Sequence, residues 1–204
     1  MPRKAYSEQE REQVRIDLMN TVIQCIVDRG LIHSSIDILC KKVNISKTFF
    51  YTFFESKEEL VLEALRYQQP KLIQYARELM EDPKLSWREG VKTFLETCVY
   101  SEKRGIAVLS IEEEQEVYHC LSKEKFMTFR EDQVRLFSNL LIIFGLPEEG
   151  IDPRLFGNIA LSMMMVYKAM PDTMPFLFPE AAEAMVTFQI NTLIDEMQRI
   201  KESV

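Results

Sequence analysis

Residues 46–57 read SKTFFYTFFESK and place five aromatic rings within the six positions from Phe49 to Phe54. Hydroxyls and lysines lie among these rings, so the stretch could pack on a core and also hydrogen-bond to a partner such as the phosphates and base edges of a nucleic acid. A buried strand could hold as many rings, but polar and apolar residues do not alternate here as they do in strands. Serines suited to capping a helix stand near each end, which favours a short helix.

The expected helix has one aromatic face and one polar face, because successive residues turn by roughly 100° around the axis. Phe50, Phe53 and Phe54 share the aromatic face. A helix of two turns is marginal alone, and burial of three phenylalanines at about 1.5–3 kcal/mol each would hold it in place. We expect these rings to pack on the helices that precede them, at Val22, Ile36 and Leu39.

The polar face carries Lys47, Thr48, Tyr51 and Thr52. The two threonine hydroxyls could bond base edges or phosphates, Lys47 could reach guanine or the backbone, and Tyr51 could donate its hydroxyl to a phosphate. Phe49 could contact a thymine methyl group or a sugar, or it could join the core. The helical spacing leaves both interpretations of Phe49 open.

Serine caps divide the N-terminal part of the chain into short helices. Candidate N-caps precede four apolar patterns of helical spacing, at Ser7, Ser35, Ser46 and Ser56. The first pattern ends at Gly30, and the second is broken by Asn44 and Ile45. Two short helices joined by a tight turn behind a longer first helix form a helix-turn-helix.

Further helices are expected downstream, separated by proline and glycine residues. They span about 57–81, 86–103, 106–118, 121–144, 153–170 and 179–202. Six glycines and eight prolines are too few for the frequent turns of a sandwich or barrel. The sequence therefore predicts an all-α fold of about nine helices, with a three-helix head at 1–56 and a larger helical body at 57–204.

Charge is unevenly distributed between these two parts. The chain as a whole has a net charge of −7, which disfavours nucleic-acid binding because phosphate contacts need lysine and arginine. Residues 1–57, however, carry nine Lys and Arg against seven Asp and Glu, whereas residues 58–204 carry sixteen against twenty-five. The head alone could therefore face a polyanion.

Several classes of protein are disfavoured by the sequence. Neither a secretory signal nor a run of about 18–20 apolar residues is present, so we expect a cytoplasmic protein with no membrane partner. We find no glycine-rich phosphate loop and no nucleophile beside a base, which argues against an enzyme. His119 and Cys120 form an isolated pair without a third ligand, so no metal or cofactor is expected. Reduced thiols, without a CxxC pair, are expected at Cys25, Cys40, Cys98 and Cys120.

The stretch VNISKTFFYTFFESKEEL resembles the helix-turn-helix and the start of the fourth helix in the TetR family of bacterial transcriptional repressors. GLIHSSIDILCKKVNIS is similar to the segment before it, whereas residues 60–204 match only in length and helical character. The resemblance implies a DNA-binding domain at 1–56 and a ligand-binding and dimerisation domain at 57–204. It also implies contacts with double-stranded DNA at the recognition helix and its flanks, through Ser35, Ser46, Lys47, Thr48, Phe49, Tyr51, Thr52 and Lys57.

Some positions depart from the family pattern. Asn44 stands where a glycine is common, and asparagine also tolerates a left-handed backbone. Thr48 and Phe49 replace the frequent glycine and threonine, and Thr52 replaces a frequent histidine, so the operator sequence cannot be taken from any relative. Ser35 and Lys57 stand near helix N-termini, where backbone N–H groups favour an anion such as a phosphate.

The last helix has two apolar stripes and so needs two partners. One stripe is expected to pack on the body and the other on a second subunit, although both could be buried within one chain. The stripes contain Ala181, Ala184, Met185, Phe188 and Thr192, and Val186, Ile190, Leu193, Met197 and Ile200. The expected homodimer interface comprises Phe156, Ile159, Ala160, Met163, Tyr167, Met185, Phe188 and Thr192.

Aromatic residues in the middle of the body could line a cavity for an apolar or aromatic ligand. The resemblance implies a small-molecule inducer at such a place, and Met127 and Met170 could join the lining. The acidic run at 112–116 is expected to be solvated, but it could favour a cationic ligand. The candidate lining residues are Trp87, Phe94, Tyr100, Tyr118, Phe126, Phe129 and Phe137.

Two functions from different classes follow from these observations. The first is a homodimeric transcriptional regulator, a repressor that binds a pseudo-palindromic operator and is released by a small molecule. The alternative is an all-helical adaptor whose head binds another protein without nucleic acid. Sequence-specific retention of DNA would separate the two.

Overall fold

The computed structural model describes residues 6–100, 106–169 and 178–203. Within these ranges the chain forms nine α-helices and two 3₁₀ helices and contains no strand, which confirms the expected all-α class. The α-helices are α1 (Glu8–Arg29), α2 (Ile36–Val43), α3 (Lys47–Phe50), α4 (Lys57–Glu81), α5 (Trp87–Val99), α6 (Ile111–His119), α7 (Lys123–Ile143), α8 (Pro153–Ala169) and α9 (Ala182–Glu202). The 3₁₀ helices are η1 (Leu31–His33) and η3 (Pro179–Ala181).

The head is built by local signals. The four predicted serine caps all accept a hydrogen bond from a backbone N–H group at the start of their helices. Asn44 ends α2 in the left-handed conformation at φ 59°, which is the role expected for it. Gly30 ends α1 at φ 78°, a value that residues with a side chain rarely adopt. The caps therefore fix the lengths of the head helices.

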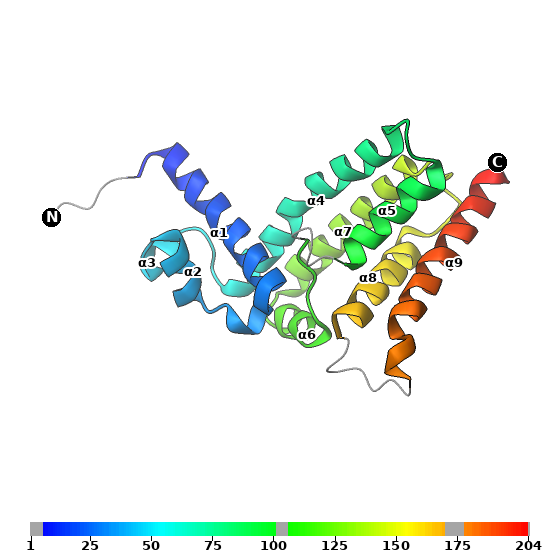
Figure 1. The fold of residues 1–204 in the computed structure, drawn as a ribbon. Helices are drawn as coiled ribbons and strands as arrows, with labels where there is room; N and C mark the ends of the chain where they lie inside the picture. Colours follow the sequence, from blue (N-terminus) through cyan, green and yellow to red (C-terminus); the bar gives the residue numbers. More distant parts are fainter. Residues whose placement is uncertain (1–5, 101–105, 170–177, 204) are drawn as a thin grey trace.

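Helix α4 runs from the head into the body (Figure 1). The buried apolar residues of the head and of the first turns of α4 belong to one continuous cluster. Buried residues of the head form one cluster with Leu60, Val61 and Leu62 of α4, and Val117 of α6 and Phe129 of α7 belong to the same cluster. The head thus shares its core with the first turns of α4 and with part of the body.

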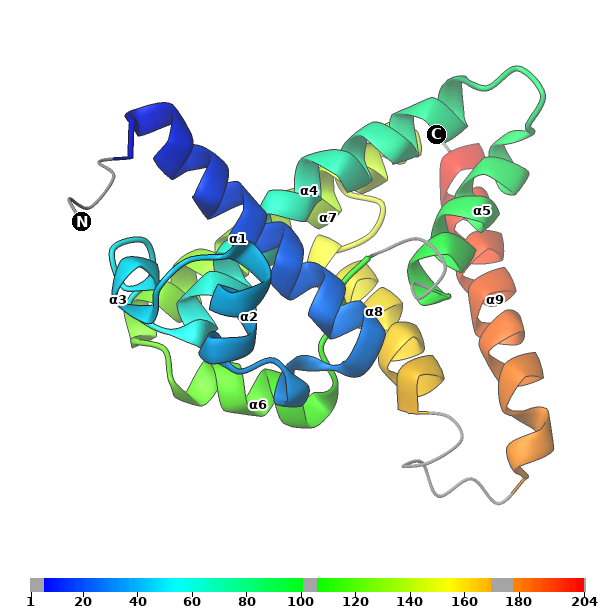
Figure 2. The same ribbon diagram turned by 60° about the vertical axis from the view of Figure 1, so that its left-hand side comes forward.

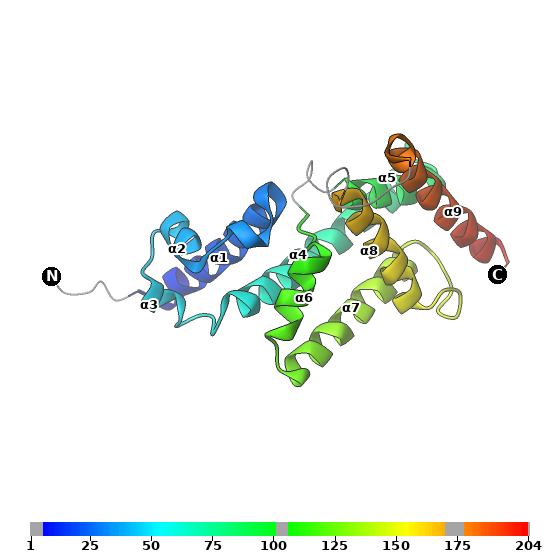
Figure 3. The same cartoon turned by 90° about the horizontal axis from the view of Figure 1, so that it is seen from below.

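The remaining helices form the body. Helices α8 and α9 lie side by side, and α5 packs against both (Figure 2). Helix α6 lies at the junction between the head and the body, as Figure 3 shows from below. No helix in the described ranges combines the length and the apolar character needed to span a membrane.

Two helix boundaries differ from those that the sequence predicts. The helix expected at 106–118 begins only at Ile111, because Ser110 and Glu113 form a capping box there and residues 106–110 are not helical. The helix expected at 86–103 ends at Val99, and residues 101–103 lie outside the described ranges. The shorter α6 matters for the site, since the non-helical segment 106–109 lines a cavity.

Candidate nucleic-acid interface and body cavity

Residues 46–53, called here the recognition segment, begin as α3 and continue as a hydrogen-bonded turn. Ser46 accepts a hydrogen bond from the N–H of Phe49 and so starts the helix. Phe50 is 0% exposed, Phe54 just beyond the segment is 2% exposed, and Phe53 is half-buried. The phenylalanines therefore hold the segment on the head core, as the helical spacing predicted.

The opposite face of the recognition segment is open to solvent. Lys47, Thr48, Tyr51 and Thr52 are all exposed, and Tyr51 is 50% exposed. The Lys47 ammonium lies 3.3 Å from Asp37, and the Thr52 hydroxyl donates to the carbonyl of Phe49 over 2.7 Å. An exposed ion pair of this kind contributes little and can be exchanged for a phosphate. The face can therefore present hydroxyl and ammonium groups to a partner.

Phe49 is half-buried and belongs to an aromatic group at the edge of the recognition segment. Its ring stacks on Tyr6 with centroids 4.5 Å apart and meets Phe53 edge-on at 4.9 Å. The Arg11 guanidinium lies 4.9 Å from the Phe53 centroid and approaches the Thr52 hydroxyl at 3.5 Å. Sequence reasoning missed Tyr6 and Arg11, because nothing in the spacing shows that the start of α1 reaches this segment.

Three flanking candidates differ in how accessible they are. Ser35 and Ser46 are exposed, and their hydroxyls already accept hydrogen bonds from backbone N–H groups as N-caps. The Lys57 side chain is only 16% exposed, and its ammonium lies 3.8 Å from Glu116 of α6. A phosphate contact by Lys57 stays a prediction, and it requires the ammonium to turn from Glu116 toward the DNA.

One carboxylate links the end of α1 to the body. Glu113 of α6 is 3% exposed and accepts hydrogen bonds from the N–H groups of Leu31 and Ser110. Lys168 of α8 lies 3.3 Å from the same carboxylate and donates to the carbonyl of Val108. A Cβ on Gly30 would come within 2.7 Å of Glu113, so this close approach needs a glycine.

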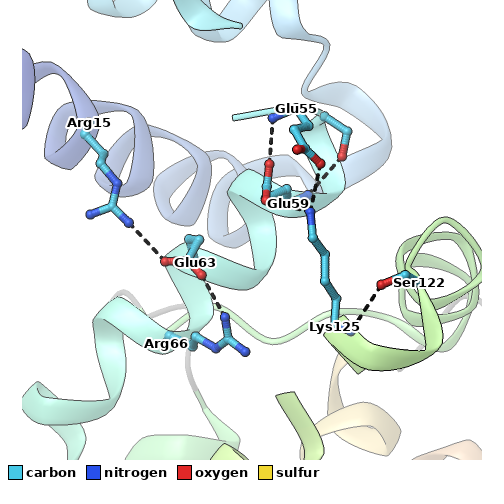
Figure 4. Close-up of polar contacts among 8 residues, drawn as sticks. Arg15, Glu55, Glu59, Glu63, Arg66, Ser122 and Lys125 are labelled. Atoms are coloured by element: carbon cyan, nitrogen blue, oxygen red, sulfur yellow. Dashed lines mark hydrogen bonds and ion pairs between the residues drawn. The ribbon is translucent and has the colours of Figure 1, made fainter. Parts of the chain in front are cut away.

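A second link is exposed and lies at the start of α4 (Figure 4). Lys125 of α7 reaches Glu55 at 2.9 Å and Glu59 at 2.8 Å. Burial alone would raise the pKa of Glu59, but hydrogen bonds from Lys125 and from the Glu55 N–H outweigh it and lower the pKa below its ordinary value. This link therefore holds Glu59 ionised.

Figure 4 also shows Glu63 of α4 between two arginines. Arg15 of α1 lies 3.0 Å from one Glu63 oxygen, and Arg66 lies 2.7 Å from the other. Arg66 in turn lies 2.7 Å from Asp132 of α7. This chain of charges connects α1, α4 and α7 at the junction.

A cavity of about 110 Å³ lies among α4, α5, α6, α7 and α8 and the segment 106–109. Tyr118, Phe129 and Phe137 of the aromatic set expected from the sequence line it. Four polar side chains also face it, namely Gln68, Gln69, Glu114 and Gln133.

The other expected lining residues pack elsewhere. Trp87 donates its indole N–H to the carbonyl of Phe144, and Phe94 meets the ring of Phe144 in the core. Tyr100 packs edge-on against Tyr167, and Phe126 packs against Tyr118 outside the lining. Met127 is exposed, and Met170 lies outside the described residues. The placement of these four aromatic residues depends on tertiary contacts, which helical spacing does not encode.

The expected dimer residues divide into two groups. Phe156, Ala160 and Met163 are at most 5% exposed within a single chain, because they pack in the core of the body, and they are not free to meet a partner. Phe188 is 70% exposed and Thr192 is also exposed, while Ile159, Tyr167 and Met185 are half-buried. The other stripe of α9 is buried on the body, at Val186, Ile190, Leu193 and Met197.

A helix-turn-helix head that continues through one long helix into a larger helical body is the architecture of TetR-family transcriptional regulators, and the chain has this fold. The fold expected from the resemblance is therefore confirmed. No protein-family model and no curated protein matches the sequence.

Three solved structures illustrate the likeness. A TetR transcriptional regulator from Legionella pneumophila is 16% identical, with a TM-score of 0.55 over 97% of this chain and 100% of that chain. A TetR-family regulator from Pectobacterium atrosepticum is 18% identical, with a TM-score of 0.54 over 92% and 94%. The reduced form of NemR from E. coli is 15% identical, with a TM-score of 0.53 over 92% and 97%. At identities this low, the likeness shows a shared fold alone.

Proposed function

We propose that the protein is a sequence-specific DNA-binding transcriptional regulator, a homodimeric repressor that a small molecule releases from a pseudo-palindromic operator. The observation that carries the proposal is the recognition segment, whose phenylalanines are buried while Thr48, Tyr51 and Thr52 are exposed. A short helix anchored in this way can enter the major groove with its polar face toward the bases. Such a regulator would work in the cytoplasm, where its operator lies.

Dimerisation would supply the second recognition segment. One helix-turn-helix covers little DNA, and paired units read half-sites about 34–36 Å apart. Phe188 on α9 is 70% exposed and supports a partner at this face, because apolar side chains gathered on one exposed stripe mark interaction sites. The half-buried Met185 and the exposed Thr192 lie on the same stripe of α9.

Helix α6 offers a route for release by a ligand. Its neighbouring residues Glu113 and Glu114 face different parts of the molecule, since Glu113 holds the N–H of Leu31 in the head and Glu114 lines the cavity. A ligand that favours one position of α6 would therefore also favour one position of the head. A coupling of about 1–3 kcal/mol would suffice to shift operator binding by about 5–150-fold.

The test is selection of bound fragments from random DNA, followed by titration of the selected site. We expect a motif with two-fold symmetry, and we expect Tyr51→Phe to weaken binding by about 2–10-fold through loss of one phosphate hydrogen bond. Lys84→Ala, an exposed lysine beyond the end of α4, is the control and should bind as the wild type does. Failure to select any motif would overturn the proposal and favour the protein-binding adaptor.

A further inference from the structure

The cavity in the body is apolar except for a few polar groups that differ in how well they are paired. Gln68 donates to the carbonyl of Ala107 over 3.0 Å and accepts from the Ala107 N–H over 3.1 Å. Its neighbour Gln69 has a buried amide nitrogen that makes no hydrogen bond to any residue that the structure describes. Gln68 therefore holds the segment at Ala107 in the cavity wall, whereas the amide nitrogen of Gln69 is left to donate a hydrogen bond to a ligand. An unpaired buried donor destabilises the fold, and a ligand that accepts a hydrogen bond from it would remove this cost.

Glu114 is the second polar group that is not fully paired. Among the described residues, Tyr118 donates to its carboxylate over a long 3.4 Å. The nearby cation Lys168 is engaged by the adjacent Glu113 and by the carbonyl of Val108. Burial raises the pKa of Glu114, and the hydrogen bond from Tyr118 offsets this only in part. A carboxylate in such a place gains most from a cation that enters the cavity.

The size of the cavity limits the ligand. An apolar cavity of about 150 Å³ in another protein accommodates benzene. The 110 Å³ here therefore suits an apolar group of about one ring or a short branched chain. The apolar walls around this group are provided by Leu65, Leu72, Leu136 and Met164.

We propose that this cavity binds a small amine. Its ammonium group pairs with Glu114, its apolar group fills the space, and its hydroxyl or carbonyl oxygen accepts a hydrogen bond from Gln69. The inference names the ligand class for the regulator proposed above, and only its effect on DNA rests on that function. Binding itself is a property of the cavity and is measured without DNA.

The first test compares four one-ring probes by calorimetry on the purified protein: benzylamine, benzyl alcohol, toluene and benzoate. We expect benzylamine to bind at least about tenfold more tightly than toluene, since hydrogen bonds to charged groups are the stronger kind. Benzoate should bind most weakly, because its charge repeats that of Glu114. Equal affinities for benzylamine and toluene, or a preference for benzoate, would overturn the proposal.

Two variants assign the contacts. Glu114→Gln keeps the shape and removes the charge, so the advantage of benzylamine over toluene should disappear. Gln69→Met removes the donor, so benzyl alcohol should lose an advantage of about fivefold over toluene. Glu112→Gln, an exposed neighbour on α6, is the matched control and should leave all four affinities unchanged. Retention of the benzylamine advantage in Glu114→Gln would contradict the assignment, and unchanged toluene binding shows that the variant is folded.

Acid provides a readout that does not depend on a variant. Protonation of Glu114 should weaken benzylamine binding as the pH falls from 7.5, and toluene binding should not change. The other titratable groups that line the cavity are Cys98 and Tyr118, whose pKa values burial raises, so neither ionises in this range. A flat pH profile for benzylamine would count against Glu114 as its partner.

A final arm separates the inference from the proposed function. Benzylamine is added to the complex of the protein with its selected DNA. If the amine binds the free protein but does not release the DNA, the cavity assignment stands and release by a ligand fails. If the wild type binds DNA but no probe, the ligand class fails and the DNA-binding proposal stands.

Discussion

The recognition segment and the body cavity are both candidate binding sites, but they are constructed in opposite ways. The segment is specified by residues close in sequence: Ser46 caps it, Phe50 anchors it, and Tyr51 and Thr52 face outward. The cavity is assembled by five helices and by a segment that is not helical, and its polar groups Gln69 and Glu114 come from different helices. A local site can be recognised from spacing, whereas an assembled one depends on the whole fold.

Phe50→Ala should break the local site with the largest effect. Its ring is 0% exposed, and truncating a buried phenylalanine costs about 3–5 kcal/mol. The free energy of unfolding, measured with urea, should fall by that amount, and DNA binding should be lost. Tyr51→Ala is the matched control, because this neighbouring ring is 50% exposed and should change stability by less than about 1 kcal/mol. Equal losses in the two variants would show that the segment is not anchored by its inner face.

The sequence predicted the local site well, and the reason is physical. Capping and a rotation of about 100° per residue act within a few residues, so the order of residues 46–54 is enough to assign their inward and outward faces. The start of α6 could also have been found, because Ser110 and Glu113 have the spacing of a capping box. The predicted helix starts earlier because the apolar residues at 106–109 suit a helix too.

The cavity was less predictable, since an aromatic side chain at helical spacing can face several neighbours. Trp87 was expected in the lining, but its N–H bonds the carbonyl of Phe144, which lies far along the chain. Gln69 carries no signal in the sequence, because an unpaired amide is visible only once every neighbour is placed. Lys57 was expected to contact a DNA phosphate, and its proximity to Glu116 depends on how α6 packs against α4.

The contact between the head and the body is tested by Glu113→Gln. The Glu113 side chain is 3% exposed and accepts hydrogen bonds from the N–H groups of Leu31 and Ser110. In the glutamine variant, an amide nitrogen in place of one oxygen would face one of these donors. We expect the free energy of unfolding to fall by about 1–3 kcal/mol and hydrogen exchange at the Leu31 amide to accelerate. Glu112→Gln, on the exposed side of α6, should do neither. An unchanged exchange rate at Leu31 would mean that Glu113 does not hold the head.

Lys57→Ala tests whether the DNA-binding surface extends beyond the recognition segment to the start of α4. If the ammonium leaves Glu116 to contact a phosphate, the slope of log affinity against log salt concentration should decrease by about 1. Glu116→Gln should have the opposite effect on affinity, because it frees the ammonium for DNA. An unchanged slope in Lys57→Ala would remove this residue from the phosphate contacts and confine the surface to the recognition segment and its caps.

The smallest effect is expected at the exposed contact between Lys125 and the start of α4, which contrasts with the buried one at Glu113. The folded-state pKa of Glu59 is lowered, so this group contributes stability that is present above its unfolded pKa of about 4.3 and is lost as the pH falls through the folded value. Lys125→Met removes the hydrogen bond that lowers this pKa. The wild type and the variant should therefore differ slightly in denaturation midpoint at pH 7 and converge toward pH 3. Since exposed pairs are screened by salt, the difference should also shrink at high ionic strength. A difference that persisted at pH 3 would show that Lys125 acts through the packing of its alkyl chain and not through its charge.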